Sequence, residues 1–362
     1  MGFHSSWRVH GVIAAALLLG GCAGAGSTSP AGQLPVAAQS ARQAATQRQF
    51  VAQPGLSRLV GISPALMPKH FSPLPQEMRP AGTPPTYILT CNVQYNDCQQ
   101  YSGSGTYIAD LPGLTAPEGT SVGQHTGAMY VANSDSQGVP VYLLTSGGPE
   151  HVTTFPDTGY LPGDVAVREL KVQNQWIALQ LYSNIFNVNY GPGNAIYTNQ
   201  FLQRQTMTAP GGYEAEGVGV AFDKAAQNCY WSNNDESKGG GYVDYYPGCA
   251  NPGVVAVRNL KFAGGLAVDE KNNLWVVDQQ NGIARCETAK HWACKTIFRA
   301  ADFVDPIFVN FSADFTTLYV ADEGAATVDA CVVATKQCSV AVTDTNSIDP
   351  NYGVAVLPAA SP

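Results

Sequence analysis

Short apolar runs separated by turn-forming residues recur along most of the chain. The runs are rich in Val, Ile, Tyr and Trp, which favour β-strands, and the intervening Gly, Asn, Asp and Pro favour turns. Two segments, residues 263–278 and 306–322, can be superposed, because each has an apolar run, a turn and a second apolar run that ends in Asp. Both segments continue into a pair of cysteines. This pattern predicts units of short antiparallel strands.

The units repeat at a regular spacing. Repeat starts fall near residues 117, 162, 216, 264, 306 and 350, at intervals of 45, 54, 48, 42 and 44. A spacing in the forties between β-prone units indicates a β-propeller. Residues 86–357 are therefore expected to form an all-β propeller of six blades, each a four-stranded antiparallel sheet. An irregular pair of β-sandwiches is the alternative.

The two ends of this region complement each other. Residues 350–356 supply only an innermost strand, whereas residues 87–98 supply a hairpin with no innermost strand before it. We therefore expect the C-terminal strand to pair with the N-terminal hairpin and to complete its blade. Such pairing closes the ring and covers sheet edges that would otherwise be exposed.

The clearest repeat resembles a known family. Residues 265–283 contain the pattern Gly-Leu-Ala-Val-Asp, Asn-Leu-Trp-Val-Val-Asp and Asn-Gly-Ile, which resembles NHL-type and related six-bladed propellers. Gluconolactonase-like members hold a divalent metal in the central channel with Glu, Asn and Asp. Glu118-Gly119 and Glu216-Gly217 are similar to that family's Glu-Gly start, although no Pro follows either pair. The resemblance implies a metal-dependent lactonase-like hydrolase as one candidate function, with a divalent cation as its cofactor.

Acidic residues stand at the predicted starts of the innermost strands. In a propeller these positions crowd the mouth of the central channel, where like charges attract a cation or raise one another's pKa. The simpler explanation is that an acid before Gly serves the turn itself. The candidate channel-mouth binding residues are Glu118, Asp164, Glu216 and Asp305, with Asp349 at the sixth start.

Other candidate functional residues are also considered for a structural role. Residues 119–123 match G-x-S-x-G, with His125 nearby, but a nucleophile elbow needs a helix after the Ser, and another strand is expected here. The tryptophans are expected to pack within the blades. Tyrosines in long loops are candidates for binding a carbohydrate or peptide, namely Tyr182, Tyr190, Tyr197, Tyr213, Tyr242, Tyr245 and Tyr246.

The cysteines favour an oxidising compartment. Nine occur, and setting Cys22 aside leaves an even number for disulfides. Zinc binding is the alternative, but no Cys-x-x-Cys occurs and only His291 lies near any pair. Three pairs have the spacing of a β-hairpin and the fourth closes a Gly-rich excursion. The expected pairs are Cys91–Cys98, Cys286–Cys294, Cys331–Cys338 and Cys229–Cys249.

The N-terminal residues predict export. An apolar stretch at residues 12–19 follows Arg8, and Leu19-Gly20-Gly21-Cys22 resembles a bacterial lipobox. The resemblance implies that residues 1–21 are a signal peptide and that Cys22 is lipidated. It also implies a lipid-anchored protein of the bacterial cell envelope, in the outer membrane if the cell has two. An ordinary signal peptide is the alternative. Residues 22–85, rich in Ala, Gln, Pro and Ser, are expected to be a flexible tether, and residues 358–362 a tail.

Composition excludes two broad classes. The chain carries 19 basic and 27 acidic residues, a net charge of −8, and no Lys/Arg cluster, which excludes nucleic acid as a partner. No uncharged apolar run reaches about 18 residues, which excludes a polytopic membrane protein. The leading hypothesis is a non-catalytic binding or scaffold module for an unknown protein, peptide or carbohydrate.

Overall fold

The computed structural model describes most of the predicted propeller. Described are residues 85–93, 95–124, 126–133, 138–156, 162–172, 175–184, 194–198, 205–210, 216–225, 227–235, 240–343 and 353–358. All of them belong to the second of the chain's two units, Thr46–Pro362. The predicted signal peptide, Cys22, the tether up to residue 84, Asp349 and residues 359–362 lie outside the described residues.

The described strands form six four-stranded antiparallel sheets, called blades here. Blade 1 consists of β24 (Gly353–Leu357), β1 (Tyr87–Asn92), β2 (Asp97–Ser102) and β3 (Tyr107–Asp110), and blade 2 of β4 (Pro117–Val122), β5 (Ala128–Asn133), β6 (Gly138–Thr145) and β7 (Gly148–Pro156). Blade 3 consists of β8 (Pro162–Val172), β9 (Gln175–Asn184), β10 (Asn194–Thr198) and β11 (Gln205–Met207), and blade 4 of β12 (Glu216–Phe222), β13 (Cys229–Asp235), β14 (Gly240–Tyr246) and β15 (Val254–Leu260). Blade 5 consists of β16 (Ala263–Val268), β17 (Leu274–Asp278), β18 (Gly282–Glu287) and β19 (Ala293–Arg299), and blade 6 of β20 (Pro306–Phe311), β21 (Thr317–Asp322), β22 (Thr327–Val332) and β23 (Gln337–Thr343). Short 3-10 turns lie at Pro247–Cys249, Thr288–Lys290 and Ala300–Asp302.

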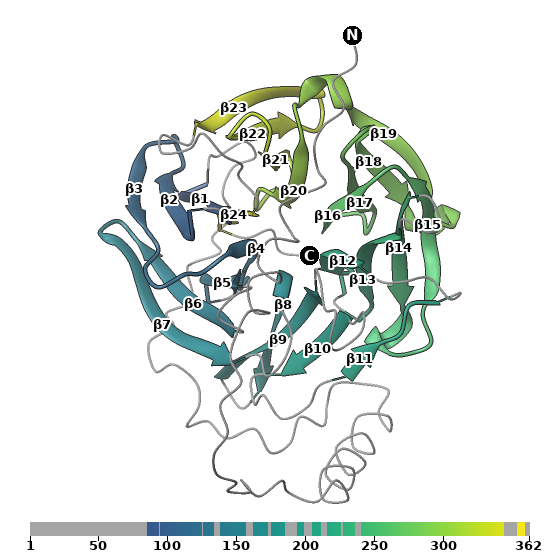
Figure 1. Ribbon diagram of the computed structural model, residues 1–362, viewed down its shortest axis with the longest axis horizontal. Helices are drawn as coiled ribbons and strands as arrows, with labels where there is room; N and C mark the ends of the chain where they lie inside the picture. Colours follow the sequence, from purple (N-terminus) through teal and green to yellow (C-terminus); the bar gives the residue numbers. More distant parts are fainter. Residues whose placement is uncertain are drawn as a thin grey trace, which may run out of the picture. The chain divides into compact units, whose positions relative to one another are not determined.

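The blades form a closed ring around one axis, as Figure 1 shows. The first strand of each blade in this order is its innermost, and β4, β8, β12, β16, β20 and β24 each contact the next, with β24 returning to β4. The predicted repeat starts fall within three residues of the observed starts of these strands. The expected six-bladed propeller is therefore confirmed.

The ring closes by pairing the two ends of the described region. Strand β24 pairs antiparallel with β1, from Tyr87 opposite Leu357 to Cys91 opposite Gly353. Ala355 and Val356 are fully buried in this pairing. The C-terminal strand thus completes the blade that the N-terminal hairpin begins, as the sequence predicts.

The core lies between the blades. Because successive strand residues point to opposite faces of a sheet, each blade contributes to two interfaces. In β1, Leu89 belongs to the same core cluster as Met129 of blade 2, whereas Ile88 belongs to the cluster that contains Tyr319 of blade 6. Trp231 and Trp275 are buried in blades 4 and 5, so the expected packing role is confirmed for them.

All four expected disulfides form, but the three hairpin pairs occupy two different places. Cys286–Cys294 and Cys331–Cys338 join the third and fourth strands of blades 5 and 6. Cys91–Cys98 joins the second and third strands of blade 1, and Cys229–Cys249 joins β13 to the turn after β14. Cysteine pairs with nearly the same sequence spacing therefore indicate a hairpin but not which hairpin of the blade it is.

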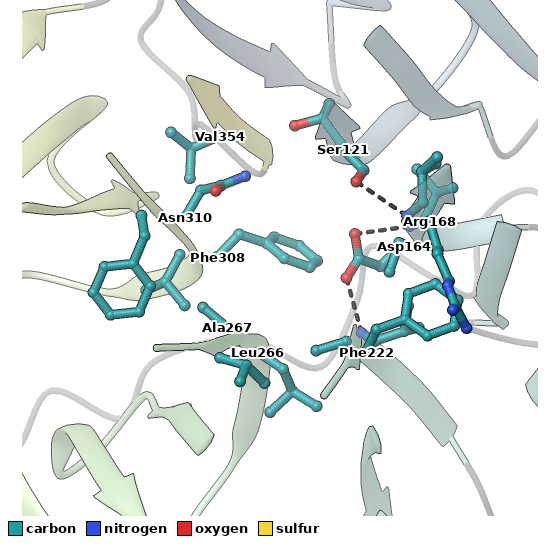
Figure 2. A pocket seen from close by; sticks show the side chains of 18 of the residues that line it. Ser121, Asp164, Arg168, Phe222, Leu266, Ala267, Phe308, Asn310 and Val354 are labelled. Atoms are coloured by element: carbon teal, nitrogen blue, oxygen red, sulfur yellow. Dashed lines mark hydrogen bonds between the residues drawn. The ribbon is translucent and has the colours of Figure 1, made fainter. Parts of the chain in front are cut away.

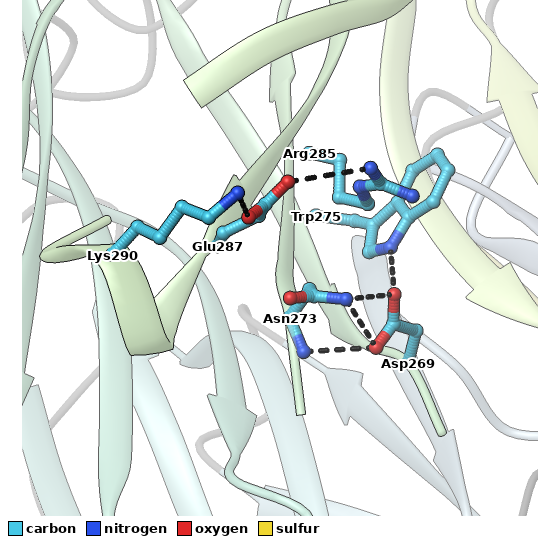
Figure 3. A network of polar contacts seen from close by, with 6 residues as sticks. All are labelled: Asp269, Asn273, Trp275, Arg285, Glu287 and Lys290. Atoms are coloured by element: carbon cyan, nitrogen blue, oxygen red, sulfur yellow. Dashed lines mark hydrogen bonds and ion pairs between the residues drawn. The ribbon is translucent and has the colours of Figure 1, made fainter. Parts of the chain in front are cut away.

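Polar side chains fix the hairpins of the clearest repeat, blade 5. Asp269 accepts hydrogen bonds from the backbone N–H of Asn273 at 2.8 Å and from Nε1 of Trp275 at 2.9 Å (Figure 3). The same view shows Lys290 and Glu287 paired at 2.6 Å in the outer hairpin. That ion pair lowers the pKa of Glu287, but exposed pairs contribute little stability. The turn at Asp269 is thus held mainly by its carboxylate network.

The acid or amide at the end of the second strand has a repeated structural role. Asn133, Asp278 and Asp322 each accept backbone N–H groups from the segment that leads into the first strand of the same blade. For Asp322 the donors are Val304 at 2.8 Å and Asp305 at 2.7 Å. Buried backbone donors must be paired, and this side chain pairs them where no strand can.

The closure leaves no room for a side chain at Gly353. A Cβ atom there would lie 2.1 Å from the carbonyl oxygen of Glu118 in the neighbouring strand β4. We expect Gly353→Ala to lower the free energy of unfolding by roughly 1–3 kcal/mol, because overpacking forces the two strands apart. Denaturant unfolding measures this, with Gly147→Ala as control, since its added Cβ would lie 3.7 Å from its nearest neighbour. Equal stability of the two variants would contradict the observed closure.

Candidate functional site

A cavity of about 140 Å³ lies on the axis of the ring. Its wall takes residues from β4, β8, β12, β16, β20 and β24, so every blade contributes its innermost strand. Most wall residues are Val, Ala, Leu or Phe, and a few are polar. Its volume is below the roughly 300–1,000 Å³ of pockets for drug-sized ligands, so only a small molecule fits.

Asp164 of β8 is one of two buried acids in this wall, at 5% exposure. Its Oδ1 accepts the N–H of Val165 at 2.8 Å, and its Oδ2 accepts the N–H of Val220, in blade 4, at 2.9 Å. Burial raises the pKa of Asp164 to about 8, against the lowering effect of these two hydrogen bonds. The carboxyl fits because Gly119 is opposite, where a Cβ would lie 2.0 Å from Oδ1.

An aromatic ring points toward this carboxyl, and a buried hydroxyl belongs to the same wall. Figure 2 shows the ring of Phe308, from β20, directed across the cavity toward Asp164. Phe308 is 5% exposed, and its ring occupies the space that a side chain at Gly265 would need. Thr120 of β4 is 8% exposed, and its Oγ1 has no hydrogen-bond partner. The wall around Asp164 therefore combines an aromatic ring with an unpaired hydroxyl.

The other end of the wall carries a charged pair. Burial lowers the pKa of Arg168, at the far end of the cavity stretch of β8, and the nearby Asp223 opposes that shift. Asp223 is 4% exposed and accepts N–H groups of Gln227 and Asn228 in its own turn. Ser121 accepts the N–H of Val167 at 3.2 Å (Figure 2). The cavity thus runs from Asp164 to Arg168, whose pKa feels the charge of Asp223.

The structure places the predicted channel-mouth acids in different surroundings. Asp164 lines the cavity, whereas Glu118 is buried and Asp305 half-buried outside its lining. The side chain of Glu216 and the whole of Asp349 lie outside the described residues. Ligand binding by these acids stays a prediction. Thr120, Arg168 and Phe308 were not among the predicted site residues, although their positions on innermost strands could have indicated them.

Asp305 belongs instead to a group of carboxyls in blade 6. Burial, and next the charge of Asp322, raise the pKa of Asp305 to about 6. The same two causes raise the pKa of Asp329 to about 6. Asp322 already accepts two backbone N–H groups, so this group serves the blade's internal structure. Among the described residues, no three His, Cys, Asp or Glu side chains gather in a way that could hold a metal ion.

The G-x-S-x-G segment has a packing explanation. It lies on β4 and is followed by strand β5, so the strand-turn-helix of a nucleophile elbow is not formed there. Gly119 makes room for Asp164, and Gly123 makes room for the carboxyl of Glu169. His125 lies outside the described residues. The two glycines therefore allow blades 2 and 3 to pack closely.

The expectation that the listed tyrosines lie in loops is wrong for three of them. Tyr242, Tyr245 and Tyr246 lie on strand β14, and Tyr242 and Tyr246 are almost fully buried. Alternating tyrosines there fill the face of a sheet, which is why a loop assignment failed. Tyr190 and Tyr213 lie outside the described residues, as do the side chains of Tyr182 and Tyr197.

A second buried carboxyl lies away from the cavity. Asp244 of β14 is fully buried, and burial raises its pKa to about 8. Its Oδ2 accepts a hydrogen bond from Asn233 at 3.1 Å and lies 3.4 Å from the hydroxyl of Tyr246. Its Oδ1 has no hydrogen-bond partner. Asp244 therefore has a raised pKa, as Asp164 does, but it does not line the cavity.

Comparisons with known proteins support the fold. No protein-family model and no curated protein matches the chain. A chain of the nidogen/laminin complex is similar in structure, with a TM-score of 0.58, 14% identity, and coverage of 74% of this chain and 97% of that one. A candidate 6-phosphogluconolactonase from Bacteroides uniformis is similar with a TM-score of 0.50, 10% identity, and coverage of 75% and 99%. At these identities the likeness shows a shared β-propeller fold alone. No helix among the described residues is long and apolar enough to span a membrane.

The burial of Asp164 predicts a pH-dependent stability. Its folded pKa of about 8 lies above the ordinary value of about 3.9, so the folded state binds the extra proton. This stabilisation is complete below pH 4 and is lost as the pH rises toward 8. We expect Asp164→Asn to remove that slope, up to about 1.4 kcal/mol per pH unit, after a constant cost of about 1 kcal/mol for one lost acceptor. Denaturant unfolding from pH 5 to 8.5 measures both.

The control for this experiment is Glu270→Gln, because Glu270 is exposed. Its stability should follow the pH profile of the unmodified protein. Parallel profiles for the unmodified protein and Asp164→Asn would show that Asp164 is charged in the folded state throughout this range. Asp244 remains in both proteins, so its own contribution cancels in the comparison.

Proposed function

We propose that the protein is a non-catalytic binding module that holds a small molecule in the cavity on the propeller axis. The observation that carries the proposal is a buried carboxyl, Asp164, with Thr120 on the neighbouring innermost strand, in a wall whose residues are mostly Val, Ala, Leu and Phe. Small-molecule sites typically combine an apolar lining with a few placed polar groups. Because all six innermost strands form the wall, the site is preorganised by the ring itself.

The site of action is proposed to be the cell envelope. The lipobox-like residues before Cys22 support a lipid anchor there, and the four disulfides fit an oxidising compartment. A propeller held at a membrane by lipid chains would meet ligands on the outer side of the cytoplasmic membrane. The same module is also proposed to bind a protein, peptide or carbohydrate partner through the surrounding loops.

A metal-dependent lactonase is the weaker candidate. The acids in the wall are Asp164 and Asp223, and Asp223 is engaged by its own turn. Asp164, Thr120 and Asn310 offer one carboxylate and two neutral oxygens, a poor donor set for a divalent cation. The described residues therefore do not fit the metal that the gluconolactonase resemblance implies, and no reaction step is derived through it.

Filling the cavity tests the binding proposal. Ala267 of β16 lines the cavity, and we expect Ala267→Phe to abolish binding of small molecules because the larger ring occupies their volume. Ligand-observed NMR with a library of small polar compounds measures binding, and circular dichroism checks the fold. The matched control is Ala293→Phe, on the exposed part of β19. The proposed site would be refuted if compounds bound Ala267→Phe and Ala293→Phe equally well. It would also be refuted if no compound bound the unmodified protein.

The lipid anchor has its own test. We expect Cys22→Ser, expressed in a bacterium that processes lipoproteins, to move from the detergent phase to the aqueous phase, because acylation needs the cysteine thiol. Detergent-phase partitioning and the intact mass report the outcome. Continued recovery of Cys22→Ser in the detergent phase would show that something other than acylation at Cys22 attaches the protein.

A further inference from the structure

Asp164 is a buried carboxyl without a counter-charge. No ion pair to Asp164 occurs among the described residues, and no neighbouring charge contributes to its pKa shift. Its two oxygens each accept a backbone N–H, an arrangement that suits a carboxylate better than a carboxylic acid. Removing water from such a group is costly unless a positive charge replaces the water.

Further hydrogen-bond acceptors lie in the same wall. The hydroxyl of Thr120 is buried without a partner, and Asn310 contributes a side-chain amide from the opposite strand β20. An ammonium group has three N–H donors and no acceptor, so it needs several oxygens around it. Asp164 and Asn310 lie on opposite sides of the cavity (Figure 2), and Thr120 belongs to the same wall, so the wall offers Asp164 and further neutral acceptors.

The rest of the wall limits the size and polarity of the ligand. Phe308, Leu266 and Phe311 are apolar and bound a volume of about 140 Å³, which suits a short hydrocarbon body. The other charged groups in the wall are Arg168 on β8 and Asp223 after β12, at the far end of the lining. The charge of Asp223 opposes the lowering of the Arg168 pKa, so the two charges partly balance each other.

We propose that the Asp164 end of the cavity binds the ammonium group of a small primary amine, whose short apolar body lies along Phe308 and Leu266. The proposal rests on the binding function above and names its ligand class. The amine supplies the counter-charge that Asp164 lacks, and Thr120 accepts a second hydrogen bond from it. Binding is therefore coupled to release of the proton from Asp164.

Three probes of similar size and different charge test the proposal. They are n-butylamine, butanol and butyrate, applied to the full chain by isothermal titration calorimetry between pH 5 and 8.5. We expect n-butylamine to bind most tightly, with an affinity that rises about tenfold per pH unit up to pH 8 and then levels off. An aliphatic amine stays charged over this range, so the slope reports the carboxyl alone.

Variants separate the roles of the residues. Asp164→Asn should weaken n-butylamine binding at least a hundredfold at pH 8 and remove the pH slope, while Thr120→Val should weaken it about tenfold and keep the slope. Asp305→Asn is the matched control, because Asp305 is an acid with a raised pKa that does not line the cavity. It should bind n-butylamine as the unmodified protein does.

The possible results are distinguishable. Tighter binding of butanol or butyrate, a flat pH profile, or unchanged binding by Asp164→Asn would overturn the amine inference and leave a binding cavity intact. If no probe binds but the compound library yields ligands that Ala267→Phe loses, the amine inference alone fails. If neither experiment finds a ligand, both the inference and the proposed function are wrong.

Discussion

The structure depends on six backbone strands approaching one another around a single axis. At Gly219 a Cβ would lie 2.7 Å from the Cα of Gly265 in the next blade, so the backbones themselves are in contact there. Such proximity buries N–H and C=O groups that have no partner within their own sheets. Side chains supply the partners, and Ser232 accepts the N–H of Gly219 at 2.7 Å and donates to the carbonyl of Gly264. Small residues and short polar side chains near the axis are thus two consequences of one constraint.

The buried carboxyl of Asp164 is a third consequence. The N–H of Val220 belongs to the blade after that of Asp164, and the carboxyl is the group that reaches it. One side chain thereby links three blades, because it also occupies the space above Gly119. The same position removes water from the carboxyl and raises its pKa. Asp164 therefore links the blades and, for the same reason, has a raised pKa.

Much of the fold could be predicted from the sequence, because it follows from local patterns. Strands, turns and Cys hairpins are set by neighbouring residues, and the incomplete repeats at the two ends predicted the closure between β24 and β1. The place of Cys91–Cys98 within its blade was not predictable from spacing, because every hairpin of a blade has the same local geometry.

The site was predicted less well, because it depends on which strands meet across the ring. Acids at similar repeat positions suggested one shared mouth, yet only Asp164 among the described ones lines the cavity, while Asp305 donates its N–H to Asp322. Phe308 faces Asp164 from the blade opposite, at a separation in sequence that no local pattern encodes. Tyr242 and Tyr246 were wrongly assigned to loops because glycines and Asp244 interrupt the apolar pattern of a mostly buried strand.

Asp164 and Asp244 show why a raised pKa alone does not identify a site. Burial brings both pKa values to about 8. Around Asp244, however, Asn233 and Tyr246 are side-chain neighbours and Arg258 exerts an opposing charge effect, so the surrounding protein already compensates part of its burial. Asp164 has backbone donors only, and it borders empty volume rather than packed side chains. A raised pKa therefore marks a candidate site only where, as at Asp164, the carboxyl also lines a cavity.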